Sequence, residues 1–312
     1  MRKNLPKNRF LRKINTFLKA NNWKMIKYID LGTTSHIFII EKKRNKKILK
    51  VLRRDFMQSN SVKLEYNILK YLNTNKMSKY VPAIEDWIEE INGFFMEYLE
   101  YPSQPENINR IYNLADALQT LHSVTIPNIE GIQDYRLSVG IALINEFKKP
   151  FKLIVNNHEW KNLTANDVPK LEIIRSKFKY YNNLLEHIEP FLKNMANSLA
   201  HGDLAGDNIM IKMDGDLALI DWGEAAISSG LFDLAYLMTY SQWNNDIRER
   251  FLKRYCNNNS LEMNEKLPLI NKLSELYRYR SCIRSLCRLR DYKENGLDMI
   301  GLKFFENQLK TI

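Results

Sequence analysis

Residues 201–208 read His-Gly-Asp-Leu-Ala-Gly-Asp-Asn, and residues 219–223 read Leu-Ile-Asp-Trp-Gly. Asp203 is followed five residues later by Asn208, and Asp221 comes thirteen residues after that, at the end of a short apolar segment. Phosphoryl transfer needs one carboxylate to orient the attacking hydroxyl and accept its proton, and hard oxygen ligands to hold Mg²⁺ against the phosphates. This order and spacing therefore predicts a phosphoryl-transfer site.

The residues between these groups predict a β-hairpin that would hold them rigidly. We expect apolar strands over 208–211 and 217–220, joined by an Asp-Gly-Asp turn. We assign no chemical role to Asp214 and Asp216 of this turn. Asp207 is expected to face solvent, with a place beside the metal as the alternative.

The rest of the chain divides into a β-rich front part and a helical remainder. Short strand patterns and one helical pattern precede Pro102 and Pro105, which interrupt the regular elements. The expected strands are 25–31, 36–40, 48–52, 84–89 and 94–99, and the helices are 59–73, 107–122, two or three within 138–195, and several from about 231. We therefore expect an α+β fold of two lobes, residues 1–100 and 101–312.

The net charge of +11 is concentrated at the front of the chain. Residues 1–54 hold 17 lysines and arginines and two acids, whereas residues 55–312 hold 30 and 34. Apolar residues from Phe10 to Leu18 recur at helical spacing among basic ones, which predicts a basic amphipathic helix packed on the following sheet. Contact with a membrane surface or a nucleic acid is the alternative. Because no basic patch is interleaved with aromatic residues, we expect no nucleic-acid partner.

The cysteines and the hydropathy point to an intracellular protein. Cys256, Cys282 and Cys287 have neither the even count of a disulfide framework nor the spacing of a zinc site. No segment approaches the ~18–20 apolar residues of a membrane span. The charged start is followed by no apolar core of a signal peptide. We expect reduced thiols and a cytoplasmic location.

The motifs His-Gly-Asp-x-x-x-x-Asn and Ile-Asp-Trp resemble those of the aminoglycoside phosphotransferase and choline kinase group. The resemblance can be followed over nearly the whole chain. It implies a protein-kinase-like bilobal fold, with a small antiparallel β-rich N-lobe for nucleotide and a larger helical C-lobe for catalysis and acceptor. It also implies that Asp203 is the catalytic base, that Asn208 and Asp221 bind Mg²⁺, and that His201 is structural.

Upstream elements of this family follow in the expected order. Lys50 in Ile-Leu-Lys-Val matches the lysine on the nucleotide phosphates, and Glu65, fifteen residues later, matches its ion-pair partner. Taken alone, Lys50 would be a surface lysine at a strand edge and Glu65 a solvated helix residue. The remaining matches are the phosphate loop with Gly32 and Ser35, the adenine-binding hinge with Glu97 and Leu99, and a buried Asp233 that braces the catalytic loop.

Several features favour a small acceptor over a protein substrate. The motif is His-Gly-Asp rather than His-Arg-Asp, and Asp221 is followed closely by Phe232, which leaves no room for a long activation segment. The run Ile-Asp-Trp-Gly-Glu-Ala resembles that of hygromycin and macrolide phosphotransferases. Glu224 within it is a candidate acceptor contact, with capping of the loop as the alternative.

The resulting hypothesis is an Mg²⁺- and ATP-dependent O-phosphotransferase, with GTP as the alternative nucleotide and an aminoglycoside-type antibiotic as the first acceptor. A housekeeping kinase of choline, ethanolamine, a sugar or an amino sugar is the alternative enzyme. A catalytically silent nucleotide-binding regulator and a nucleic-acid-binding module are the alternatives outside enzymes. The sequence leaves the acceptor and the oligomeric state open.

Overall fold

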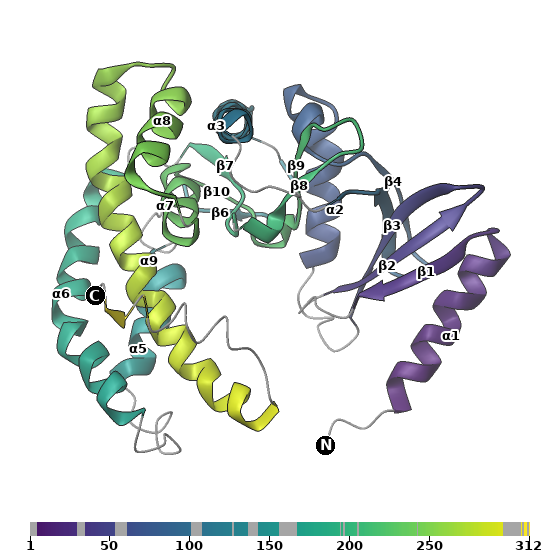
Figure 1. Cartoon of the computed structure of the whole chain (residues 1–312), viewed down its shortest axis with the longest axis horizontal. Coiled ribbons are helices and arrows are strands. Elements are labelled where there is room, and N and C mark those ends of the chain that lie inside the picture. Colours follow the sequence, from purple (N-terminus) through teal and green to yellow (C-terminus); the bar gives the residue numbers. More distant parts are fainter. Residues whose placement is uncertain are drawn as a thin grey trace. The chain divides into compact units, whose positions relative to one another are not determined.

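The structure is a computed structural model that describes most of the chain (Figure 1). The described residues are 5–29, 35–53, 61–100, 108–126, 128–136, 143–155, 167–193, 195, 197–204, 206–241, 243–295, 307, 309–310 and 312. They fall into two compact units. The first comprises residues 1–132, 201–203 and 207–225, and the second comprises 133–200, 204–206 and 226–312. The expected lobe boundary at residue 100 stays a prediction.

The first unit contains a five-stranded antiparallel sheet, as predicted. Its order is β1-β2-β3-β5-β4. The strands are β1 (Lys24–Ile29), β2 (Ser35–Lys42), β3 (Asn45–Leu52), β4 (Ile84–Ile88) and β5 (Gly93–Glu97). The ladder places Lys47 of β3 opposite Glu97 of β5, and Ser35 of β2 opposite Leu52 of β3. Ser35 and Glu97 therefore lie at opposite ends of the sheet.

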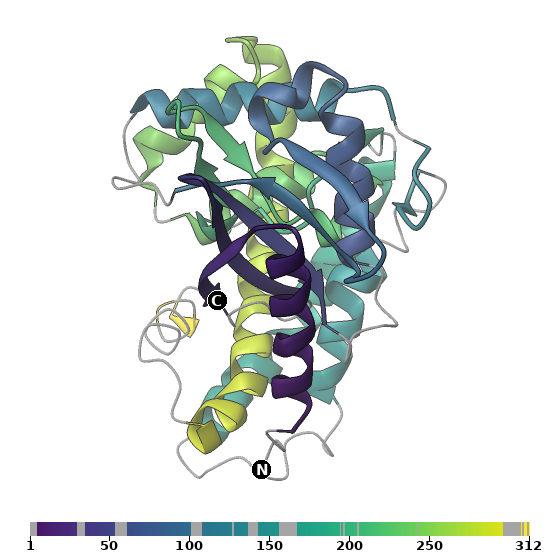
Figure 2. The same cartoon turned by 90° about the vertical axis from the view of Figure 1, so that its right-hand side faces the viewer.

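Helices cover the two faces of this sheet. Helix α1 (Leu5–Ala20) lies along one face, as Figure 2 shows, and its Ile14 and Leu18 are buried with Phe38 and Leu49. This confirms the interpretation of α1 as a packed amphipathic helix. Helix α2 (Ser61–Leu72) lies against the other face. Since successive side chains of a strand point to opposite faces, Lys50 points toward α2.

The first unit also holds the predicted hairpin of the catalytic segment. Strands β8 (Ile209–Ile211) and β9 (Leu217–Leu219) pair antiparallel, and the turn between them contains Gly215 at φ +90°. The 3-10 turn η5 (Gly206–Asn208) precedes β8 and the 3-10 turn η6 (Trp222–Glu224) follows Asp221. Helix α3 (Ile108–Ser123) and the 3-10 helix η2 (Lys76–Tyr80) complete this part.

The second unit is mainly helical. Its helices are α5 (Lys149–Val155), α6 (Val168–Lys193), α7 (Leu231–Tyr240), α8 (Asn245–Tyr255) and α9 (Ser260–Asn295), with the π-helix η3 (Ile144–Lys148) and a three-stranded sheet of β6 (Gln133–Asp134), β10 (Ala226–Ser228) and β7 (Ser198–Ala200). Aromatic rings join three helices, since Tyr181 of α6 stacks on Tyr279 of α9 and Phe151 of α5 meets Tyr279 edge-on. The predicted helical character of this part is confirmed.

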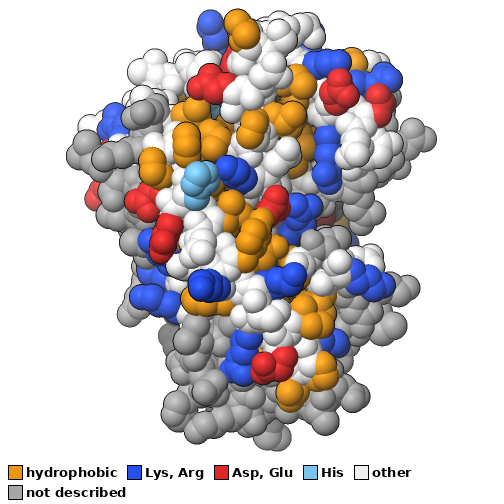
Figure 3. Space-filling model, turned by 90° about the vertical axis from the view of Figure 1, so that its left-hand side faces the viewer, with side chains coloured by type: hydrophobic (Ala, Val, Ile, Leu, Met, Phe, Trp, Pro, Cys, Tyr) orange, Lys and Arg blue, Asp and Glu red, His pale blue; other side chains and the backbone are white. Residues whose placement is uncertain are grey.

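The surface on the side of α6 is mixed, with hydrophobic, basic and acidic side chains interspersed (Figure 3). Cys256 and Cys282 are buried free thiols, and the side chain of Cys287 lies outside the described part. Within the described ranges, no helix is both long enough and apolar enough to cross a membrane.

Candidate active site

Three charged side chains from distant parts of the sequence meet in the first unit. Lys50 Nζ lies 2.5 Å from Glu65 Oε2 and 2.9 Å from Asp221 Oδ1. The backbone N–H of Asp221 donates to Glu65 Oε1 at 3.2 Å. The side chains of Lys50 and Glu65 are 6% and 1% exposed, whereas that of Asp221 is 47% exposed. The cation is therefore held from inside by one carboxylate and from the solvent side by another.

The pKa values reflect this arrangement. Burial opposes the charge on Lys50, but the carboxylates of Glu65 and Asp221 outweigh it and raise its pKa. Lys50 lowers the pKa of Asp221, and burial raises the pKa of Glu65 despite the nearby Lys50. Lys50 and Asp221 are thus ionised near neutral pH, and of the two carboxylates Glu65 takes up a proton first on acidification.

The backbone at Lys50 and at Asp221 has special features. A Cβ added at Gly93 of β5 would lie 2.4 Å from the carbonyl oxygen of Lys50, so only glycine allows β3 and β5 this close approach. Asp221 has φ +65° and ψ +62°, a left-handed conformation that a non-glycine residue adopts at a cost.

The candidate catalytic segment, residues 201–208, is ordered by its own hydrogen bonds. His201 is fully buried, and its Nε2 donates to the carbonyl oxygen of Ile220 at 2.8 Å. This leaves Nδ1 to accept the backbone N–H of Asp203 at 3.3 Å. The amide nitrogen of Asn208 donates to the carbonyl oxygen of Asp203 at 2.6 Å and to its Oδ2 at 3.3 Å. The histidine therefore joins the Asp203 segment to the strand that leads into Asp221.

Gly202 is a residue of this segment whose role the motif alone does not reveal. Its φ is +84°, and an added Cβ would lie 2.2 Å from the carbonyl oxygen of Glu224. Both the backbone angle and the space thus require glycine. The predicted acceptor residue Glu224 is exposed, and its main chain packs against Gly202.

Asn208 and Asp221 fit the donor set of a magnesium site. The amide nitrogen of Asn208 is used by Asp203, which leaves its Oδ1 as a ligand, and one oxygen of Asp221 remains beside the one at Lys50. Mg²⁺ prefers such oxygens and keeps several waters or phosphate oxygens, so two protein ligands are sufficient. The described residues contain no cluster of three or more His, Cys, Asp or Glu side chains that would form an all-protein cage.

The remaining predicted site residues lie in both units of the chain or outside the described residues. Ser35 is buried at the start of β2, and Leu99 is buried after β5. The backbone N–H of Glu97 donates to the carbonyl oxygen of Ala83, and the N–H of Ala83 donates to Glu97 Oε2. Gly32 lies outside the described residues. Asp233 is buried in α7 of the second unit. Two further residues were missed by sequence reasoning: Gly93, and Ser61, which lies against Gly223. The available signal at Gly93 was a glycine inside a strand, and Ser61 had none.

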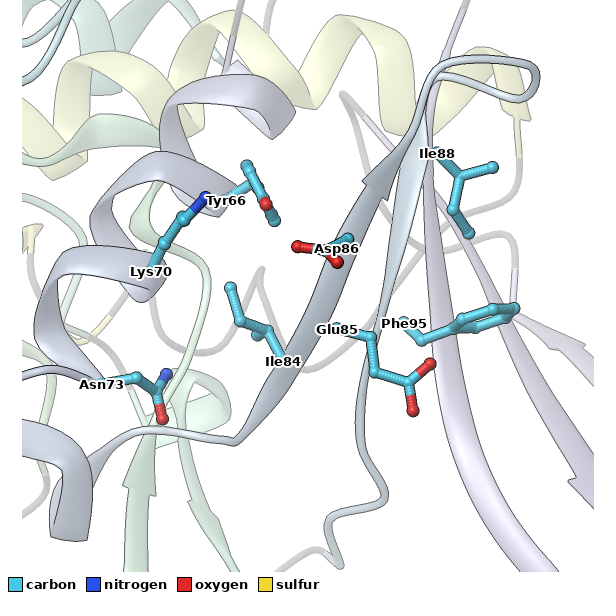
Figure 4. A pocket seen from close by; sticks show the side chains of 8 residues that line it. All are labelled: Tyr66, Lys70, Asn73, Ile84, Glu85, Asp86, Ile88 and Phe95. Atoms are coloured by element: carbon cyan, nitrogen blue, oxygen red, sulfur yellow. The ribbon is translucent and has the colours of Figure 1, made fainter.

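A cavity of about 600 Å³ lies elsewhere in the first unit, between α2 and the edge strand β4. Tyr66 and Lys70 project from α2, Asn73 follows the end of that helix, and Asp86 of β4 points toward them (Figure 4). None of the predicted site residues lines it. The candidate site around Lys50 and Asp221 is therefore separate from this cavity.

Comparison with known proteins decides the family. A model of the phosphotransferase enzyme family (APH) matches residues 26–267, more than three quarters of the chain. The chain belongs to the phosphotransferase enzyme family. It is therefore a small-molecule phosphotransferase. Among curated proteins, no sequence matches it.

Solved structures of this family share the fold. The choline kinase of Cryptosporidium parvum has a TM-score of 0.63 at 14% identity, covering 96% of this chain and 94% of its own. The aminoglycoside phosphotransferase APH(2″)-IIa bound to gentamicin has a TM-score of 0.62 at 18% identity, covering 96% of both chains. The choline kinase LicA from Streptococcus pneumoniae has a TM-score of 0.58 at 17% identity, covering 97% and 98%. The predicted protein-kinase-like fold is thus confirmed.

Proposed function

We propose that this phosphotransferase moves the γ-phosphate of ATP to a hydroxyl of a small molecule, with an aminoglycoside-type antibiotic as the first acceptor to test. The observation that carries the proposal is the buried Lys50–Glu65 pair joined to Asp221, in the same unit as Asp203 and Asn208. These are the groups that phosphoryl transfer requires: a cation for phosphates, oxygen ligands for a metal, and a carboxylate base.

Each residue has one role in this proposal. Asp203 orients the acceptor hydroxyl and takes its proton while the hydroxyl oxygen bonds to the γ-phosphorus. The bond from that phosphorus to the bridging oxygen breaks, and ADP leaves. Lys50 neutralises phosphate charge, and Glu65 holds Lys50 in place. Asn208 and Asp221 would hold Mg²⁺, which when bound offsets the negative charge of the phosphates.

Further residues would position nucleotide and loop. Gly32 and Ser35 would cover the phosphates, and the backbone at Glu97 and Leu99 would bind adenine. His201, fixed on Ile220, keeps the Asp203 segment in place, and a corresponding bracing role is proposed for Asp233. In this scheme residues 1–100 are the nucleotide lobe and 101–312 the catalytic and acceptor lobe.

Related structures support the nucleotide and the acceptor classes without choosing among the acceptors. APH(2″)-Ib is described with ADP, APH(2″)-IIa with streptomycin and ATP, and LicA with AMP. GTP stays the alternative nucleotide. Choline or ethanolamine kinase activity is the alternative function, because kinases for these amino alcohols share the fold to the same degree. Glu224 would contact a cationic acceptor in either case. The buried free thiols Cys256 and Cys282 support a cytoplasmic location.

The test compares two aspartates of one loop. ADP release is measured with ATP, GTP and a panel of aminoglycosides, macrolides, choline, ethanolamine and amino sugars. We expect Asp203→Asn to abolish turnover and keep the thermal shift caused by nucleotide, whereas Asp207→Asn, which is exposed, keeps both. Near-native turnover by Asp203→Asn would refute the assignment. Nucleotide binding without turnover on the whole panel would favour the silent regulator.

A further inference from the structure

One end of the five-stranded sheet carries a dense group of cations, which we call the basic tip. It is formed by the turn after α1, the start of β1 and the β2–β3 hairpin. The register places Lys24 and Lys46 on either side of Glu41, and Lys42 Nζ donates to the carbonyl oxygen of Asn21, which joins the hairpin to the turn after α1. The basic tip comprises Lys19, Lys24, Lys42, Lys43, Arg44, Lys46 and Lys47.

Acidic side chains neutralise only part of the basic tip, in which Lys47 pairs with Glu85 of β4. Glu41 is the single acid in residues 19–29 and 41–47. Lys19, Lys24, Lys43 and Arg44 are exposed, and within the described ranges none of these four forms an ion pair. Gathering like charges on one end of a sheet costs free energy through their repulsion, and a partner of opposite charge relieves that cost.

The backbone conformation of the β2–β3 turn supports a function for Lys43 and Arg44. Lys43 and Arg44 form the two-residue turn between Lys42 and Asn45, with φ +50° and +68°. A type I′ turn requires positive φ at both central positions, and Asn-Gly is the pair that fills them without strain. The chain instead carries two bulky cations in left-handed conformation, and such an outlier supports a hypothesis of function.

Structural explanations account for part of the basic tip only. A lysine at the C-terminal end of α1 interacts favourably with the helix dipole, and this explains Lys19. A lysine on the edge strand β1 discourages pairing with the sheet edge of another molecule, and this explains Lys24. Neither applies to Lys43 and Arg44, because β2 and β3 are interior strands and their turn needs no charge.

We propose that the basic tip binds the anionic surface of a lipid membrane. Ile26 of β1 is 45% exposed next to Lys24 and Lys27, and this mixture of cations with a few apolar side chains suits a headgroup layer. A single-stranded nucleic acid would need an aromatic ring with an open face. Trp23 does not offer one, because Lys42 and Lys47 each lie 5.6 Å from its ring centroid and Phe95 lies at 5.4 Å.

The proposed contact lies away from the end of β2 at Ser35 and does not depend on the proposed acceptor. The hairpin turn at Lys43 and Arg44 and the start of β2 at Ser35 stand at opposite ends of one strand pair. Docking through the turn therefore leaves the predicted phosphate loop uncovered. A membrane-bound enzyme of this kind would phosphorylate its acceptor close to the site where that molecule enters the cell or is used.

The test uses the full chain and a double variant, Lys43→Asn with Arg44→Gly. Co-sedimentation is measured with vesicles of equal parts phosphatidylcholine and phosphatidylglycerol, and with phosphatidylcholine alone. Each cation near an anionic surface contributes about 1 kcal/mol, or about fivefold in affinity, so the double variant should bind ~25-fold more weakly. Because the Asn-Gly turn relieves backbone strain, its melting temperature should rise rather than fall.

A matched control removes two exposed lysines from α6, Lys177→Gln with Lys179→Gln, and should bind as the unchanged protein does. The proposal is overturned if the two double variants lose the same affinity, or if vesicles of phosphatidylcholine alone bind equally well. It is also overturned if a duplex DNA oligonucleotide binds and anionic vesicles do not. A rise in melting temperature with a loss of vesicle binding would show that the cations serve binding rather than folding.

Discussion

The buried ion pair between Lys50 and Glu65 makes the substitution Glu65→Gln the most informative change to the fold and the site together. The amide keeps the size of the side chain and an oxygen to accept the N–H of Asp221. It removes only the charge that faces Lys50 at 2.5 Å. Breaking a buried pair by removing one partner costs ~3–5 kcal/mol, since the other charge stays buried. Asp221 remains beside Lys50, so we expect the lower end, about 3 kcal/mol.

The assay is thermal unfolding of the full chain, with nucleotide affinity measured in parallel. A loss of this size lowers the melting temperature by about 2–4 °C per kcal/mol for a unit of this length. Nucleotide affinity should fall as well, because Lys50 loses its anchor. The control is Glu89→Gln, which removes the solvent-exposed partner of Lys63 at 3.6 Å and should change stability by less than ~1 kcal/mol. If Glu65→Gln were no more destabilising than Glu89→Gln, the reasoning from burial would be wrong.

Three further outcomes follow from the described contacts. Gly202→Ala should reduce kcat at least about tenfold with nearly unchanged nucleotide affinity, because the new methyl group meets the carbonyl oxygen of Glu224; equal kcat would contradict the strained geometry. Leu18→Ala should cost ~2–5 kcal/mol in urea unfolding, and a change below ~0.5 kcal/mol would mean that α1 is not part of the core. Burial raises the pKa of Glu65, so acidification protonates it and removes the partner of Lys50. Nucleotide affinity, titrated without turnover, should fall as the pH falls, and Glu65→Gln should lack that fall.

The order of elements could be predicted from the sequence because its signals are local. Strands of the first unit show apolar runs between polar turns, and the hairpin of β8 and β9 is marked by Asp-Gly-Asp. The candidate site could be proposed from local signals too, because Asp203, Asn208 and Asp221 lie within nineteen residues, spaced by a loop and a hairpin.

Contacts between distant residues could not be predicted by spacing. By its local pattern Lys50 is a surface lysine of a strand edge, yet its side chain is almost fully buried. Only the fold shows that β3 is central and that α2 brings Glu65 across to it. Gly93 is another example, because its need for a missing side chain arises from Lys50 on a neighbouring strand. Acceptor specificity has no local pattern at all, since many side chains of the helical part have equivalent spacing.

Backbone strain occurs at three residues to which a function is proposed in this chain, Lys43, Arg44 and Asp221. Among the described residues, those with positive φ other than glycine are Asn22, Lys43, Arg44, Asn92, Asp221, Asn257 and Asn258. Asparagine tolerates the left-handed region, so its presence at four of these seven positions needs no further cause. The exceptions are the metal-ligand candidate and the two cations of the basic tip. Glycine at Asp221 would relieve strain of ~1–3 kcal/mol but would remove the carboxylate beside Lys50. The same reasoning applies to Lys43 and Arg44: where a strained backbone is combined with a charged side chain, the charge is the reason the strain is kept.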